Sequence, residues 1–166
     1  MASKTLQDLF IHSLSDVYSA EKQLTRALPK MARASKNANL RAAFETHLEE
    51  TRGQIERIDQ AVESCGIKLK RIKCVAMEGL VEEGQEQIED FEEGPIRDAA
   101  LIAAAQKVEH YEIATYGTLA TLADQLGFKE ASKLLLETLA EEKTTDEKLT
   151  QLAKLEVSKE AQAAAA

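Results

Sequence analysis

The chain has 166 residues, of which 44% are hydrophobic and 30% charged, so it fits one soluble globular domain and excludes a disordered chain. Seven Gly, two Pro, four Phe, three Tyr and no Trp are too few for a β-sandwich or barrel, whereas the abundant Ala, Leu, Glu, Gln and Lys favour α-helix. The formal net charge of −8 argues against nucleic-acid binding, which needs a clustered basic face.

No feature of the sequence indicates a membrane or an export signal. No apolar run approaches the roughly 18–20 residues of a membrane span. The first sixteen residues contain acids and lack the apolar core of a secretory signal, so we expect a cytoplasmic protein. The two cysteines, Cys65 and Cys74, are then expected to be reduced.

Apolar residues at helical spacing predict two long helices in the first part of the chain. The first covers residues 3–35, with Ser3 as its N-cap. The second covers residues 40–65, with Asn39 as its N-cap and Gly66 as its stop. The turn between them is short and polar, so the two helices should pack antiparallel.

The second part of the chain predicts one short and two long helices. The short helix covers residues 75–91 and has one acidic, solvent-facing side. The third long helix covers residues 95–126 and ends at Gly127, and the fourth covers residues 129–157. Residues 158–166 end in four alanines, and we expect them to form a flexible tail.

Two helical hairpins joined by a connection of about 28 residues predict an all-α fold. So long a connection lets the second and third long helices point the same way. That is the topology of a ferritin-like four-helix bundle, not of a simple up-down-up-down bundle. We therefore expect residues 1–157 to form a single ferritin-like domain whose crossover contains a short fifth helix.

Polar side chains interrupt the apolar stripes of all four long helices. Glu109 and Glu112 lie within roughly 40° of the centre of the third stripe, and Glu142 and Asp146 within roughly 20° of the centre of the fourth. Seven residues of this kind form the candidate site: Glu21, His47, Glu50, Glu109, Glu112, Glu142 and Asp146.

These seven residues lie 10 to 19 positions from their own hairpin turn, or roughly 15–29 Å along the helix, so they should form one layer. Six carboxylates and an imidazole cannot be buried together as bare ions. No Lys or Arg lies on the third or fourth stripe at that level to pair with them. A bound divalent cation resolves the conflict, and carboxylates with one imidazole suit Fe(II), Mn(II) or a mixed pair.

Each residue taken alone also has an ordinary interpretation. Glu21 could be a stripe-margin residue that reaches solvent, His47 a hydrogen-bonded core residue, and Glu50 a solvated side chain. The two acidic pairs on the later helices could also be solvated. Tyr116, one turn after Glu112 on the same face, could donate a hydrogen bond to a ligand or simply pack. The common depth of the seven residues favours the metal-site interpretation.

Five stretches of the sequence resemble the bacterial YciE/YciF family of ferritin-like stress proteins, and with their spacing they cover nearly the whole chain. KVEHYEIATYG and CVAMEGL are the motifs most specific to that family. The stretches are DVYSAEKQLTRALPKM (16–31), AAFETHLEET (42–51), CVAMEGLVEEG (74–84), RDAALIAAAQKVEHYEIATYGTLA (97–120) and LAEEKTTDEKL (139–149).

The resemblance implies a cytoplasmic homodimer related to rubrerythrin and linked to general or osmotic stress. It also implies a dinuclear metal site carried by Glu21, Glu50, Glu109, Glu112 and Glu142, with His47 and Asp146 nearby. The chain departs from the wider ferritin-like pattern of Glu-x-x-His on two helices. Its second helix reads His47-x-x-Glu50, and its fourth helix has no His.

Two classes of function follow from these expectations. In the first, two Fe or Mn ions react with peroxide or oxygen, with Glu50 and Glu112 bridging the ions and Glu21 and Glu142 as terminal ligands. The sequence has no rubredoxin-like Cys-x-x-Cys pairs to supply electrons. In the second, the protein is a non-enzymatic structural or interaction dimer with a structural or vestigial metal. An iron-storage shell and a DNA-protecting role are weaker alternatives.

Overall fold

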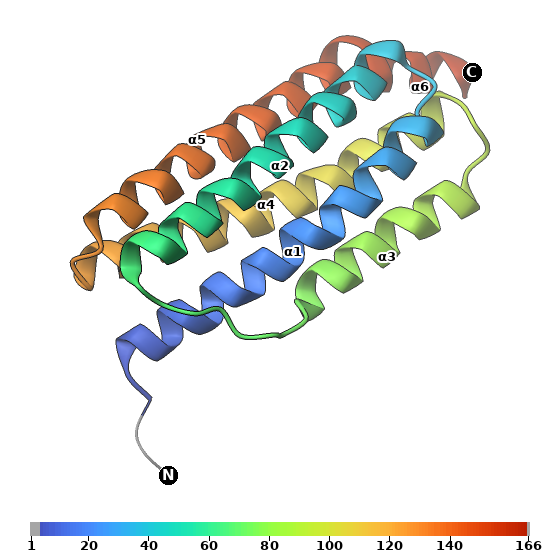
Figure 1. The fold of residues 1–166 in the computed structure, drawn as a ribbon. Helices are drawn as coiled ribbons and strands as arrows, with labels where there is room; N and C mark the ends of the chain where they lie inside the picture. The colour runs from blue at the N-terminus through green and yellow to red at the C-terminus, as the bar shows by residue number, and fades with distance from the viewer. Residues whose placement is uncertain (1–3, 166) are drawn as a thin grey trace.

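The computed structural model describes residues 4–165, and helices follow one another along most of this span (Figure 1). Within the described residues there is no strand, so the predicted all-α class is confirmed. None of the helices there combines the length and the apolar character that crossing a membrane requires. The elements are α1 Leu6–Ala34, α2 Ala38–Cys65, α3 Val75–Asp90, α4 Pro95–Gln125, α5 Lys129–Leu152, the π-helix η1 Ala153–Val157 and α6 Ser158–Ala164.

Four long helices form the bundle, and the crossover sets their directions. In Figure 1, α1, α3 and α5 run one way along the molecule, whereas α2 and α4 run the other way. α1 packs on α2 and α4, and α5 also packs on both of these helices. The parallel course of α2 and α4 confirms the ferritin-like topology.

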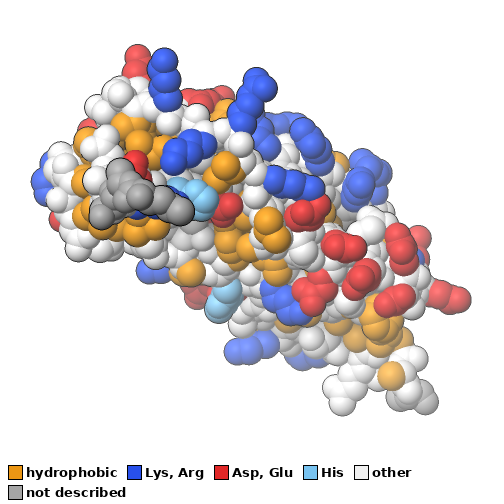
Figure 2. Space-filling model, turned by 90° about the horizontal axis from the view of Figure 1, so that it is seen from below, with side chains coloured by type: hydrophobic (Ala, Val, Ile, Leu, Met, Phe, Trp, Pro, Cys, Tyr) orange, Lys and Arg blue, Asp and Glu red, His pale blue; other side chains and the backbone are white. Residues whose placement is uncertain are grey.

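The crossover helix α3 lies outside the four-helix core, against α1 and α4 (Figure 1). It forms the lower side of the molecule in that view. Figure 2 shows the molecule from below, with acidic side chains gathered over one half of the face. On α3, Glu78, Glu82, Glu86 and Glu89 are exposed, as the amphipathic pattern of this helix predicts.

The caps at the start of α1 and α2 differ from the sequence prediction. Thr5 caps α1, because its hydroxyl accepts from the Asp8 amide while the Asp8 carboxylate accepts from the Thr5 amide. The predicted cap, Ser3, lies outside the described residues. Asn37 rather than Asn39 caps α2, because its side-chain oxygen accepts two backbone N–H groups of the first turn.

The predicted glycine stops are confirmed. Gly66 follows α2 with φ 64°, and Gly127 follows α4 with φ 77°. This left-handed conformation is unfavourable for residues with a Cβ, so glycine ends a helix there at the lowest steric cost.

The C-terminal end differs most from the expectation. The fourth helix was expected to be continuous to residue 157, but α5 ends at Leu152 and a π-helix follows. The expected flexible tail instead forms α6, which packs against α4. Alanine has the highest helix propensity, and Val157 and Ala161 bury their side chains, so burial and propensity act together here.

The core consists of two apolar clusters separated by a polar layer. On α1, Phe10 to Val17 belong to one cluster and Ala20 to Met31 to the other, with Glu21 near the boundary. The other three long helices also contribute to both clusters, with acids or His47 between their apolar segments. The sequence predicted a layer of this kind near mid-bundle.

Candidate metal centre

Each of the four long helices contributes at least one side chain to the polar layer. α1 supplies Glu21, α2 supplies His47, α4 supplies Glu109 and Glu112, and α5 supplies Glu142. All five are at most 3% exposed. They lie on the inner faces because the apolar stripe of each helix turns that face toward the bundle axis.

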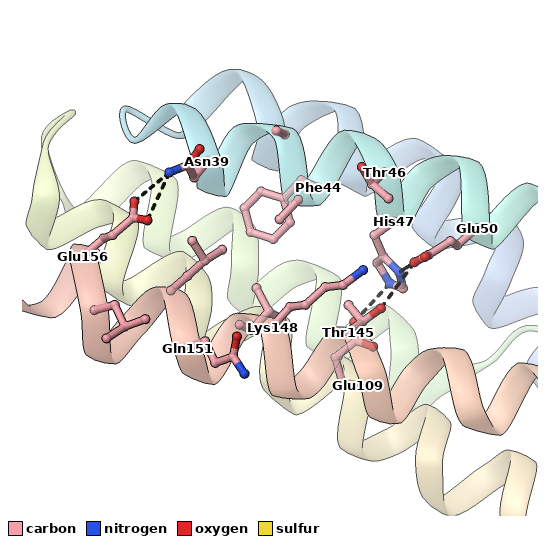
Figure 3. A pocket seen from close by; sticks show the side chains of 15 residues that line it. Asn39, Phe44, Thr46, His47, Glu50, Glu109, Thr145, Lys148, Gln151 and Glu156 are labelled. Atoms are coloured by element: carbon pink, nitrogen blue, oxygen red, sulfur yellow. Dashed lines mark hydrogen bonds and ion pairs between the residues drawn. The ribbon is translucent and has the colours of Figure 1, made fainter.

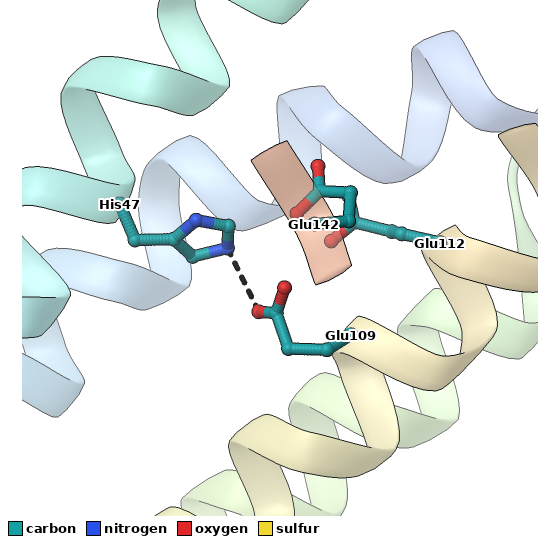
Figure 4. Close-up of side chains that lie close together, drawn as sticks. All are labelled: His47, Glu109, Glu112 and Glu142. Carbon is teal, nitrogen blue, oxygen red and sulfur yellow. Dashed lines mark ion pairs between the residues drawn. The ribbon is translucent and has the colours of Figure 1, made fainter. Parts of the chain in front are cut away.

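Four of these residues form a compact group that could surround a metal ion (Figure 4). His47, Glu109, Glu112 and Glu142 each offer one ligand atom, and these atoms all lie within 4.8 Å of one another. His47 Nε2 lies 3.0 Å from Glu109 Oε1. Three helices therefore converge on one point.

Glu21 lies next to this group. Its Oε1 accepts a hydrogen bond from the Tyr116 hydroxyl, and its carboxyl group lies near enough to that of Glu112 for each to alter the pKa of the other. Tyr116 is fully buried, so its hydroxyl holds Glu21 in place from inside the core. Of the two sequence interpretations of Tyr116, the donor role is the one the structure supports.

Glu50 lies at the rim of the layer. Its side chain is 28% exposed, and its Oε2 lies 3.6 Å from His47 Nδ1. The Thr145 hydroxyl on α5 donates to the same carboxylate at 3.3 Å. Glu50 is therefore the one acid beside the group that solvent reaches from the α2–α5 side.

Asp146 does not join the group. Its side chain is 22% exposed, and its carboxylate contacts Gln106 Nε2 at 3.2 Å and His110 Nε2 at 3.1 Å. Asp146 follows Glu142 by four residues, which rotates it by about 40° around α5. Its contacts with Gln106 and His110 of α4 hold its carboxylate away from the four-residue group, so we leave it out of the proposed ligand set.

The buried layer contains polar atoms without hydrogen-bond partners. His47 Nε2 belongs to this set because its approach to Glu109 lacks hydrogen-bond geometry. Buried polar groups almost always have hydrogen-bond partners, and burying an unpaired charge costs free energy. A bound metal ion would be the partner that these atoms lack. The unpartnered atoms of the layer are Glu21 Oε2, His47 Nδ1 and Nε2, Glu109 Oε2, and both carboxylate oxygens of Glu112 and of Glu142.

Burial and mutual repulsion change the proton affinities of the layer. Burial, followed by neighbouring carboxylates, raises the pKa of Glu112 and of Glu142 well above the usual range. Burial raises the pKa of Glu21 to about 7, although the Tyr116 hydrogen bond opposes this. Burial lowers the pKa of His47, but the carboxylates of Glu109, Glu50 and Glu142 together raise it well above its ordinary value. Without a cation, the layer must therefore hold protons at neutral pH.

A groove between α2 and α5 leads to this layer (Figure 3). Its volume is about 370 Å³, and its buried end is formed by His47 and Glu109, with Glu50 beside them. Thr145 and Lys148 also line it, and neither was predicted from the sequence. The signal for Thr145 was its place three residues after Glu142 on the same helical face.

Comparison with known proteins places the chain in one family. The sequence profile of the family described as "Domain of unknown function (DUF892)" matches residues 5–162. The chain is 68% identical to Protein YciF of Escherichia coli (strain K12) over 163 residues, which is 98% of either chain.

Solved structures agree with the fold. The crystal structure of the E. coli stress protein YciF has a TM-score of 0.92 and 69% identity, and the match covers 95% of this chain and 99% of that one. YcfI from Rhodopseudomonas palustris, described as a candidate structural protein, has a TM-score of 0.85 and 44% identity over 89% of this chain and 94% of its own. A protein of Xanthomonas campestris pv. campestris shares the fold alone, at 20% identity and a TM-score of 0.78 over 98% and 100%.

Proposed function

The chain belongs to the DUF892 family, and we propose that it binds two divalent metal ions, iron or manganese, in its core and reacts with peroxide or oxygen. The observation that carries this proposal is the group of buried carboxylate oxygens without partners. A stress-response role is part of the proposal because the similar E. coli protein is described as a stress protein. We also propose that the protein is a cytoplasmic homodimer.

The donor atoms select the metal. Carboxylates with one imidazole suit Fe(II) and Mn(II), whereas thiolates favour softer or more tightly bound ions. Cys74 is not part of the group, because its sulfur lies 3.1 Å from the Tyr111 hydroxyl on the side of α3. Fe(II) and Mn(II) are also the ions that can give electrons to an oxidant.

The ligand roles follow from the contacts. The group of His47, Glu109, Glu112 and Glu142 would hold one ion, and Glu21 and Glu50 would complete the site for the second. Glu112 belongs to the four-residue group and lies next to Glu21, so we assign it the bridging role. We assign Glu50 the role of second bridging carboxylate.

The chain's own residues would prepare the site in two further ways. The protons held by Glu112 and Glu142 leave when a cation takes their place, so metal binding releases protons. The two apolar clusters exclude water from the layer along the bundle axis, and the α2–α5 groove stays open to it. When bound, the metal pair would supply the electrons and the Lewis acidity for the reaction with oxidant.

The test is metal content and turnover in untagged protein. We expect bound Fe or Mn in the purified protein, metal-dependent loss of peroxide or oxygen, and loss of both in Glu112→Ala and Glu142→Ala. Glu147→Ala is the matched control, because Glu147 is exposed on the same helix as Glu142. Turnover that persists after the metal is removed, or that survives in Glu112→Ala, would contradict the proposal.

A second candidate is a non-enzymatic structural or interaction dimer whose metal is structural or vestigial. The similarity of this chain to YcfI, which is described as a candidate structural protein, favours this second function. The partly buried Leu80, Val81 and Ile88 on α3 could contribute to such an interface. Bound metal without any turnover would favour this function over the first.

A further inference from the structure

The α2–α5 groove combines an apolar wall with a polar inner end. Ala43 and Phe44 of α2 face Leu149 and Leu152 at the end of α5, and all four contribute apolar atoms to the lining. Phe44 and Leu149 are each 2% exposed, so the wall continues into the core rather than lying on the surface. A groove of about 370 Å³ has the size of a small-molecule site.

The polar atoms of the groove are distributed unevenly. At its buried end lie His47, Glu109 and the hydroxyl of Thr145, with the charged side chains of Glu50 and Lys148 beside them (Figure 3). At the other end the carboxylate of Glu156 is already held by the side-chain amide of Asn39, at 3.0 Å from each oxygen. A ligand that matches this pattern has a compact apolar body and one oxygen-bearing end directed inward.

We propose that the groove binds organic hydroperoxides, with the apolar body against Phe44 and Leu149 and the hydroperoxyl end toward His47. This inference rests on the proposed function, since it names the substrate class of the same site. An organic hydroperoxide would gain binding free energy by burying its apolar body against this wall. Hydrogen peroxide has no apolar body and would gain none.

The metal pair would act as the reductant of the hydroperoxide. The O–O bond of the hydroperoxide breaks and takes up two electrons and two protons, giving one alcohol and one water. Two Fe(II) ions held by the carboxylates and His47 of the layer would supply one electron each, and solvent would supply the two protons. The alcohol product keeps the apolar body and one hydroxyl, so it should also bind the groove, and it does so without any redox step.

The first measurement is binding of 2-phenyl-2-propanol, the alcohol from cumene hydroperoxide, to the metal-free protein by NMR. We expect shifts at Phe44 and Leu149, and a loss of affinity of about tenfold in Ala43→Trp, which fills the groove. Ala114→Trp is the matched control, because Ala114 is an exposed alanine that lines a different hollow on α4. Leu155→Glu, at a site 66% exposed on the outer wall, should also weaken binding without disturbing the core.

The second measurement is single-turnover oxidation of the Fe(II)-loaded protein by cumene hydroperoxide and by hydrogen peroxide. The ratio of the two rates should fall about tenfold in Ala43→Trp and stay constant in Ala114→Trp. An unchanged ratio, together with no alcohol-induced shifts at the groove, overturns the inference while leaving the proposed function intact. Alcohol binding that is sensitive to Ala43→Trp, with no oxidation by either peroxide, supports the groove assignment and contradicts the proposed peroxide chemistry.

Discussion

Glu142 shows how a charge can be tolerated at the centre of a helical bundle. It is fully buried on α5, and neither of its carboxylate oxygens has a hydrogen-bond partner. Its pKa is raised by burial and by neighbouring Glu109, which means that the metal-free protein keeps it neutral by binding a proton. A buried carboxylate that destabilises the metal-free protein and stabilises the metal-bound protein is typical of a metal ligand. It is not typical of a residue that only stabilises the core.

Replacing Glu142 with Gln should therefore separate stability from metal binding. We expect Glu142→Gln to stabilise the metal-free protein at pH 8 by at least about 1 kcal/mol, because no proton has to be taken up on folding. The same variant should lose metal affinity by at least about 100-fold. Urea unfolding and metal titration measure the two effects. Glu147→Gln, on the exposed side of α5, should change neither.

The raised pKa values also predict how stability depends on pH. The pKa of Glu21 is about 7 in the folded protein and 4.5 ordinarily, so between these values the folded chain holds more protons than the unfolded chain. The metal-free protein should then lose stability as pH rises from about 4.5 to about 7, by about 1.4 kcal/mol per pH unit for each such proton. A thermal-unfolding series in chelator checks this, and a stability that increases over that range would be the opposite result.

Tyr116 supports the centre through Glu21. Removing its hydroxyl in Tyr116→Phe leaves the Glu21 carboxylate without its donor, which raises the pKa of Glu21 further and weakens its hold on a cation. We expect metal affinity to fall by about 10–100-fold, as is typical when a residue that supports a ligand is lost. Isothermal titration calorimetry with Mn(II) measures this loss of metal affinity. Tyr18→Phe, at a half-buried tyrosine of α1 that is not part of the four-residue group, should bind Mn(II) like the unaltered protein.

At the scale of the helices, the sequence predicted most of the fold because apolar spacing is a strong signal over long segments. α2 and α4 were predicted to within two residues at each end, and Gly66 and Gly127 end them. The residues that cap the helices were harder to predict from the sequence. Which of Asn37 and Asn39 would cap α2 depends on which side chain points back to the turn, and Asn39 instead binds Glu156, 117 residues away.

Long-range contacts also explain the errors at the site. The helical angle alone placed Asp146 as close to the stripe centre as Glu142, but Gln106 and His110 on α4 hold its carboxylate outside the layer. The π-helix after Leu152 and the burial of Val157 likewise depend on packing against α4. No periodicity along one helix contains that information.

Asp98 at the start of α4 offers a test at this scale. Its carboxylate is 1% exposed and accepts hydrogen bonds from the Lys36 and Asn37 amides, both at 2.8 Å, so it ties the α1–α2 turn to α4. Asp98→Ala should destabilise the protein by about 2–3 kcal/mol, since two hydrogen bonds to a buried carboxylate are lost and two partly buried backbone amides are left unpaired. Chemical denaturation measures this. Asp124→Ala should have a small effect, because its ion pair with Lys129 is exposed.

At the scale of the whole molecule, the crossover brings the acids together. The 66–94 segment returns along the bundle so that α2 and α4 run parallel, and this places His47 beside Glu109 although 62 residues separate them in the sequence. The same arrangement leaves the α2–α5 groove open to the layer. The two apolar clusters then stabilise the bundle on both sides of a centre that is itself destabilising without a cation.

The most direct test of this account is anomalous X-ray diffraction from crystals of protein loaded with Fe(II) or Mn(II). The account predicts two metal peaks, about 3.5–4 Å apart, with His47, Glu112 and Glu142 among the ligands. Metal found only on the exposed acids of α3, or a layer that stays free of metal at saturating concentration, would contradict it.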